Sequence, residues 1–201
     1  MMLRYHMHSS LDLVRAIERL LIRGSLEEAR TLASAIAEAP AEPDLGAWAI
    51  QATTVRDRAA AVAAAPGLDE ALRREVRLAE ACADCHVETR VQPEFRTTPA
   101  LPPDRDTVPA RMARHRWAAD RLWEGVIGAD DVPWRAGLAV LAAAPLRWPE
   151  LGERKGFARS LQQLADQARQ RQATDSIAER ARLYGEMLVV CAACHTSKPA
   201  P

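Results

Sequence analysis

The sequence predicts an all-α fold built as two tandem up-down antiparallel four-helix bundles joined by a proline-rich linker. Three observations support this prediction. Apolar residues recur at helical spacing, no segment shows the alternation of a strand, and the two halves of the chain can be laid over one another. The predicted division of the 201 residues is a first bundle over 1–89, a linker over 90–109 and a second bundle over 110–201.

Residues typical of helix ends divide the first half into four expected helices. Gly24 ends the first, Ser25 caps the second, Pro40 stops it, and Pro66 ends the third. Short loops between consecutive helices favour antiparallel neighbours. The expected helices cover 9–23, 25–40, 48–65 and a segment that leads into Cys82.

The second half repeats this order of helices. Ser176 and Glu179 match the pattern of a capping box, although Thr174 competes as the cap. Apolar residues of the last helix advance in steps of four and three and so share one stripe, which His195 continues. The expected helices cover 110–127, 130–144, 154–172 and 174–194.

Between the halves lies a segment without periodic apolar residues. It contains five prolines within 90–109, a composition typical of a semi-rigid, partly extended linker. The overall composition is balanced, with 27 basic and 27 acidic side chains, so we expect no nucleic-acid partner. The longest uncharged stretches are too short to span a bilayer, so we expect no membrane-spanning segment.

The strongest repeat signal is a Cys-X-X-Cys-His motif that occurs at 82–86 and again at 191–195, an offset of 109 residues. Around Pro40 and Pro145 the offset is 105, which indicates a small insertion in the second copy. At this offset Met7 falls on Met112.

Cys-X-X-Cys-His is the attachment signal for c-type haem. Two thiols one helical turn apart can each form a thioether to a porphyrin edge, while the adjacent imidazole reaches the iron. The alternatives are buried or redox-active cysteines, disulfides, and one zinc ion bound by all four thiolates. A thioredoxin-like site is excluded because no strands are expected.

Taken together, four-helix units of about a hundred residues that end in this motif resemble the cytochrome c-prime family and its low-spin relatives. The resemblance implies two covalently attached c-type haems. It places them on two pairs of cysteines with one proximal histidine each: Cys82, Cys85 and His86 for the first haem, and Cys191, Cys194 and His195 for the second.

In that family the first helix of the bundle covers the distal face of the haem. Met7 and Met112 lie at equivalent places on the two first helices, so we expect them to be the distal iron ligands. The alternative is that both methionines fill the core. His8, beside Met7, and His115, one turn after Met112, are the runner-up ligands, although His115 is equivalent to Ser10 in the first half.

Methionine and imidazole ligation raises the reduction potential and closes the iron to external ligands, which suits electron transfer. We therefore expect a dihaem electron-transfer cytochrome that meets redox protein partners, not an enzyme. The alternatives are a five-coordinate haem protein that binds NO or CO, and an accessory subunit of a membrane-bound respiratory or photosynthetic complex.

Two further expectations concern location and charge. The resemblance implies a bacterial periplasmic protein, yet the first residues lack a signal peptide, so the export signal is expected to lie outside this chain. Arg4 and Arg111 could pair with haem propionates, but arginines line most of the expected helices, which favours a solvated face for both.

Overall fold

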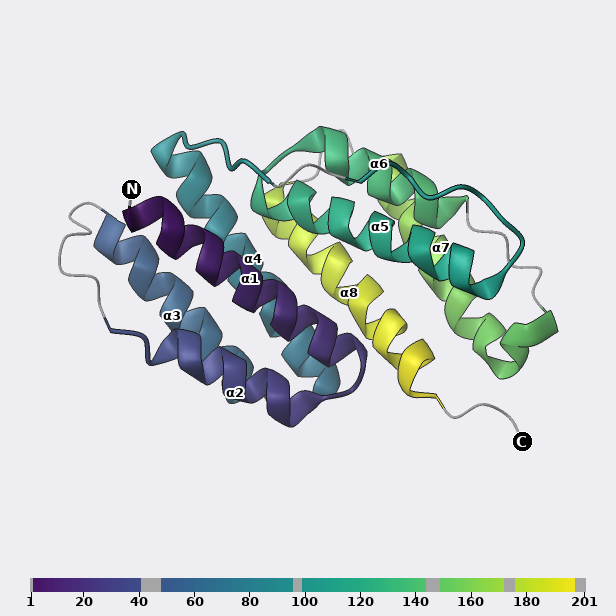
Figure 1. Cartoon of the computed structure of the whole chain (residues 1–201), viewed down its shortest axis with the longest axis horizontal. Coiled ribbons are helices and arrows are strands. Elements are labelled where there is room, and N and C mark those ends of the chain that lie inside the picture. The colour runs from purple at the N-terminus through teal and green to yellow at the C-terminus, as the bar shows by residue number, and fades with distance from the viewer. Residues whose placement is uncertain (1, 41–47, 96–98, 144–148, 172–175, 198–201) are drawn as a thin grey trace.

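A computed structural model describes residues 2–40, 48–95, 99–143, 149–171 and 176–197, without the side chains of residues 2–8 and 149–150. Within these residues every regular element is helical, as the sequence predicts (Figure 1). A short 3-10 segment, η2 (Pro149–Arg154), precedes α7. The helices are α1 (Met2–Ile22), α2 (Leu26–Ala37), α3 (Ala49–Ala63), α4 (Leu68–Thr89), α5 (Val108–Ile127), α6 (Asp131–Ala142), α7 (Lys155–Arg171) and α8 (Ile177–Thr196).

The observed helices differ from the expected ones mainly at the start of α1, which begins at Met2 and not at residue 9, and at the end of α4. Helices α4 and α8 continue through the Cys-X-X-Cys-His residues, because neither motif includes a glycine or proline that would interrupt a helix. Helix α4 ends only at Arg90, which has a left-handed φ of 56°, and Val91 N–H donates to the carbonyl of His86. Each motif is therefore held on a rigid helical turn.

Helix caps agree with the sequence in part. The Ser176 hydroxyl accepts from the Glu179 N–H at 3.2 Å, as the capping pattern predicts, while Thr174 lies outside the described residues. Gly24 lies in the turn that ends α1, as the sequence predicts, and has a left-handed φ of +81°. Ser25 occupies the predicted N-cap position of α2. Its side chain makes no cap hydrogen bond, so the position was predicted correctly but the hydrogen bond was not.

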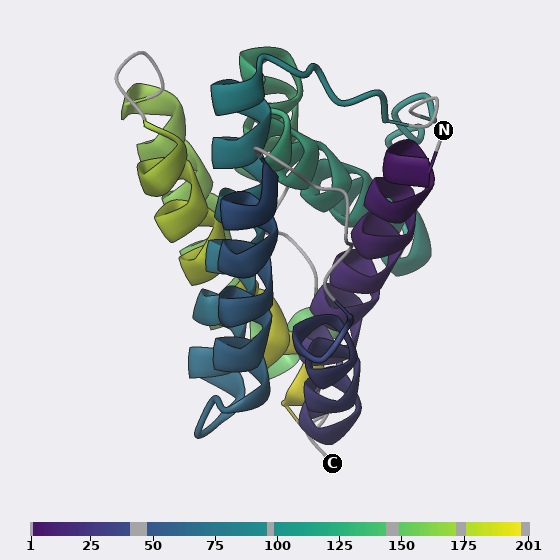
Figure 2. The ribbon, with the colours of Figure 1, turned by 90° about the vertical axis from the view of Figure 1, so that its left-hand side faces the viewer.

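Each half packs its four helices in chain order. Helix α2 lies between α1 and α3, and α3 lies between α2 and α4, while α1 also contacts α4. The same relations hold among α5, α6, α7 and α8. Figure 2 turns the molecule so that the first four helices face the viewer.

The two halves pack against each other along their motif helices. Helices α4 and α8 make the main contact between halves, and α1 touches α8 while α4 touches α5 (Figure 1). A Cβ atom on Gly24, just after α1, would lie only 2.7 Å from the Thr196 side chain at the end of α8. Each motif helix thus ends beside the C-terminal end of the first helix of the other half.

Four buried residues at the centre of this contact follow the internal repeat. At the 105 and 109 offsets, Glu18 of α1 corresponds to Trp123 of α5, and Glu75 of α4 corresponds to Tyr184 of α8. The Tyr184 hydroxyl donates to Glu18 Oε1 at 3.0 Å. Burial and the charge of Glu18 raise the pKa of Glu75, and the nearby Trp123 indole acts in the opposite direction. The two contacts are therefore equivalent under the repeat, although their side chains differ.

The described part of the linker runs along α5 and has no helical structure up to Thr107, while Val108 and Pro109, expected in the linker, already belong to α5. The Trp117 indole N–H donates to the carbonyl of Pro99 at 2.8 Å, and the Arg114 guanidinium donates to that of Pro102 at 2.7 Å. The ring of Phe95 packs at Gly128, where a Cβ would approach it to 3.1 Å. These contacts fix the linker to the second half. None of the described helices is long and apolar enough to cross a bilayer.

Candidate functional site

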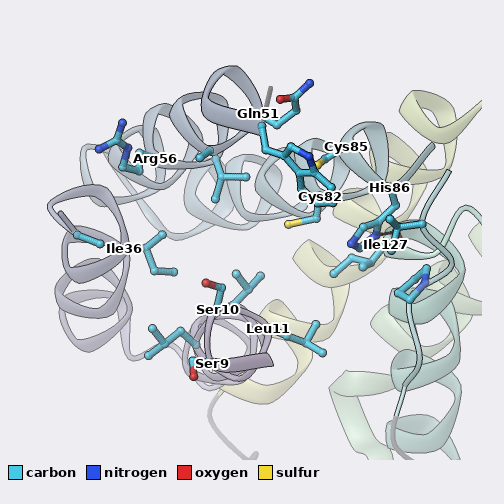
Figure 3. A pocket seen from close by; sticks show the side chains of 18 of the residues that line it. Ser9, Ser10, Leu11, Ile36, Gln51, Arg56, Cys82, Cys85, His86 and Ile127 are labelled. Atoms are coloured by element: carbon cyan, nitrogen blue, oxygen red, sulfur yellow. Dashed lines mark hydrogen bonds between the residues drawn. The ribbon is translucent and has the colours of Figure 1, made fainter. Parts of the chain in front are cut away.

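The first Cys-X-X-Cys-His motif opens into a cavity of ≈ 730 Å³ between the helices of the first half (Figure 3). Cys82, Cys85 and His86 all line it from α4, so the structure brings the three motif side chains to one wall. The cavity is mostly apolar, and its volume is within the range of pockets that enclose a small organic molecule or cofactor. The other walls come from α1, α2, α3, the start of the linker and the end of α5.

His86 is oriented by the other half of the molecule. Its Nδ1 lies 3.0 Å from the backbone carbonyl oxygen of Ile127, at the C-terminal end of α5 (Figure 3). A helix end leaves such carbonyls without partners inside the helix, so they accept readily from a ring N–H. With the proton on Nδ1, the Nε2 lone pair of His86 is free to bind a metal, which is the usual arrangement of a histidine ligand.

The four cysteines are free thiols. Burial, followed by the charges of Cys85 and Glu75, raises the pKa of Cys82 to about 12. Burial, followed by the charges of Cys194 and Glu18, raises the pKa of Cys191 to about 12. These two thiols stay protonated at neutral pH, which is unlike the low-pKa thiolates of redox and metal-thiolate sites.

The two cysteine pairs do not form one site. They lie on separate helices, α4 and α8, each with its own histidine. Among the described residues no group of three or more histidine, cysteine or carboxylate side chains could hold a metal ion. The alternative of one zinc ion bound by four thiolates therefore has no support from the geometry.

Across the cavity from the motif, α1 presents Ser10, Leu13 and Val14. Figure 3 shows Ser10 opposite Cys82, on the other side of the cavity. Met7 precedes Ser10 by almost one helical turn and so belongs to the same face of α1, although its side chain and that of His8 lie outside the described part. Ser10, Leu13 and Val14 thus form the cavity wall opposite the motif, next to Met7, which the sequence predicts to be the distal ligand.

The second motif is more open than the first. His195 is exposed as a residue, but partial burial of its imidazole, followed by the charge of Arg154, lowers its pKa. Cys191 and Cys194 are half-buried. Pro145, the equivalent of Pro40 in the first cavity, lies outside the described residues, so part of this second wall is not described.

His115 and Met112 both lie on α5, and both are half-buried. Burial is the main cause that lowers the pKa of His115 to about 4, and the charges of His195 and Arg111 add to it. The Nε2 atom of His115 is fully buried and has no hydrogen-bond partner within the described structure. The helix therefore holds a neutral imidazole within electrostatic range of His195.

Arg111 corrects one expectation. Its side chain is buried, not solvated, and its guanidinium donates to Asp106 at 2.6 Å. It lies close enough to His115 for its charge to lower the pKa of that imidazole. The side chain of Arg4 lies outside the described residues.

Comparison with known proteins identifies no relative, since no family model, no curated protein and no solved structure matches the chain. The site must therefore be interpreted from its own geometry. Sequence reasoning missed the Ile127 carbonyl and the buried carboxylates Glu18 and Glu75. A backbone acceptor carries no residue signal, and glutamates on helices are usually exposed.

Proposed function

We propose that the chain is a dihaem c-type cytochrome that acts as an electron-transfer protein. The observation that carries this proposal is the first cavity, where two thiols and an oriented imidazole share one apolar wall. The same motif recurs at the equivalent end of α8. Because the motif occurs in both halves, we propose that the whole chain consists of two tandem four-helix bundles that resemble cytochrome c-prime.

The cysteines would hold each haem through two thioether bonds. Each forms when the S–H of a thiol adds across a vinyl double bond, so nothing is lost from thiol or porphyrin. Cys82 and Cys85 line the cavity one helical turn apart, which suits two vinyl groups on one porphyrin edge. Cys191 and Cys194 have the same spacing on α8.

His86 and His195 would be the proximal iron ligands. The Ile127 carbonyl fixes the tautomer and the ring orientation of His86 and makes the ligand more basic. The bound haem iron supplies a one-electron couple. The chain's part is to hold the axial side chains on rigid helices, to exclude water with an apolar wall and to keep the geometry the same in both oxidation states.

The proposed distal ligands lie on the first helix of each half. Met7 remains the proposed ligand of the first iron, because its helix face continues into the cavity through Ser10. At the second site Met112 and His115, one turn apart on α5, are the two candidate ligands. Partners are proposed to be redox proteins, and the location is proposed to be the bacterial periplasm, where c-type haem is attached.

A second candidate function is the binding of NO or CO at the first site. It is favoured by the described distal wall, where Ser10, Leu13 and Val14 offer no side chain that ligates iron strongly. If Met7 does not reach the iron, the first haem is five-coordinate and open. Uptake of CO by the reduced protein at this site would identify this function, and its absence supports electron transfer.

The test is haem attachment in a bacterial host that carries out c-type haem maturation. The double variant Cys82→Ala, Cys85→Ala should lose half of the covalent haem, measured on the denatured protein. The matched control is Asp84→Ala, an exposed residue within the same motif whose equivalent is already Ala193, and it should keep both haems. Equal haem content in the double variant and the wild type, or no haem in either, would overturn the proposal.

A further inference from the structure

The two motif sites differ at one position of the internal repeat. At the 105 offset Ser10 of α1 corresponds to His115 of α5. Ser10 lines the first cavity together with Cys82 and His86. Because the two halves arrange their helices alike, we expect the residue at this position to lie toward the motif in each half, and the charge of His195 does reach His115. The first site therefore presents a hydroxyl where the second presents an imidazole.

One ring nitrogen of His115 has no hydrogen-bond partner among the described residues. This atom, Nε2, is fully buried, and no described residue donates to it or accepts from it. Burial of an imidazole nitrogen without a partner costs free energy that a folded protein normally avoids. Position alone does not make a histidine a ligand, but His115 also has a buried ring nitrogen without a partner and lies within electrostatic range of His195.

Met112 has no comparable feature that points to the site. It precedes His115 by three residues on the same helix and is half-buried, as a methionine that fills the core would be. Imidazole nitrogen is also a common ligand of haem iron.

We infer that His115 is the distal iron ligand of the second haem, which is therefore held by two imidazoles, His195 and His115. This inference rests on the proposed function. The first haem has no such histidine at Ser10, so the two sites differ in ligation. Bis-histidine ligation gives a lower potential than histidine with methionine, so electrons would rest on the first haem and pass there from the second.

The experiment starts with haem-loaded protein whose intact mass shows two haems. A mass without haem refutes the proposed function itself, so the two failures are distinguishable. In the wild type labelled with 15N-histidine, three of the five histidines should show resonances shifted by the iron. Only two shifted imidazoles would overturn the inference without the use of any variant.

Variants then identify the ligand. His115→Ala should convert one of the two haems to a high-spin form that gains one equivalent of CO when reduced, and added imidazole should restore the low-spin spectrum. Met112→Leu tests the competing ligand, and Arg116→Ala, at an exposed position beside His115, is the matched control; both should leave the spin state and the CO stoichiometry unchanged. Low-spin haem at both sites in His115→Ala, or a high-spin haem in Met112→Leu, contradicts the inference. If His115→Ala does not fold, the labelled wild type decides.

Discussion

The substitution Glu18→Gln tests the buried contact between the two halves. Burial is the main cause that raises the pKa of Glu18 to about 7 from an ordinary value of 4.5, and nearby Asp120 adds to it. The hydrogen bond to Tyr184 and the charges of Arg15 and Arg19 act in the opposite direction without cancelling it. Glu75, whose pKa burial also raises, lies close to Glu18.

The sign of the pH dependence follows from this difference. Between pH 4.5 and 7 the folded protein keeps a proton on Glu18 that the unfolded chain releases, so stability falls as the pH rises through this window. Above pH 7 Glu18 is charged in both states, and its ionisation in the folded protein costs roughly 3 kcal/mol. Glutamine keeps the acceptor for Tyr184 and removes the charge.

We therefore expect Glu18→Gln to be more stable than the wild type by roughly 3 kcal/mol at pH 8, with a much smaller difference at pH 5. Urea unfolding followed by far-UV circular dichroism at both pH values measures this. Asp57→Asn, an exposed carboxyl on α3, is the control and should show no such pH-dependent gain. A difference that is the same at both pH values would refute the reasoning.

Three further predictions test the packing and the site. In Gly137→Ala the new Cβ would lie 2.7 Å from the Ala118 carbonyl oxygen, so α5 and α6 must separate, and we expect a loss of about 1–3 kcal/mol in urea unfolding. Gly156→Ala, with open space around it, should not destabilise. Cys82→Ala should leave the first haem on one thioether and alter the reduced absorption band of that haem alone. Met7→Ala should remove the methionine-to-iron charge-transfer band of the oxidised protein, and a band that persists would exclude Met7 as a ligand.

Helix positions were largely predictable from the sequence, because Gly24, Pro40 and Pro66 interrupt a clear apolar period. The first helix begins at Met2 and not at residue 9, since nothing between those positions disfavours a helix. The all-helical class is confirmed by the described residues.

The packing of the halves was not predictable. The contact of α4 with α8 buries Glu75, a residue type that pattern reasoning assigns to the surface. Likewise, His86 depends on the Ile127 carbonyl from the other half, a partner 41 residues away that has no side-chain signature. The motif could be found from its spacing, but the cavity beside it depends on tertiary structure.

The central claim is that this chain carries two covalent haems, and intact mass tests it most directly. The protein should be produced in a host that attaches c-type haem and measured under denaturing conditions, which remove any haem that is not covalently bound. We predict a mass above that of the polypeptide by two complete haem groups, because thiol addition to a vinyl group releases no atoms. The mass of the bare polypeptide would contradict the account.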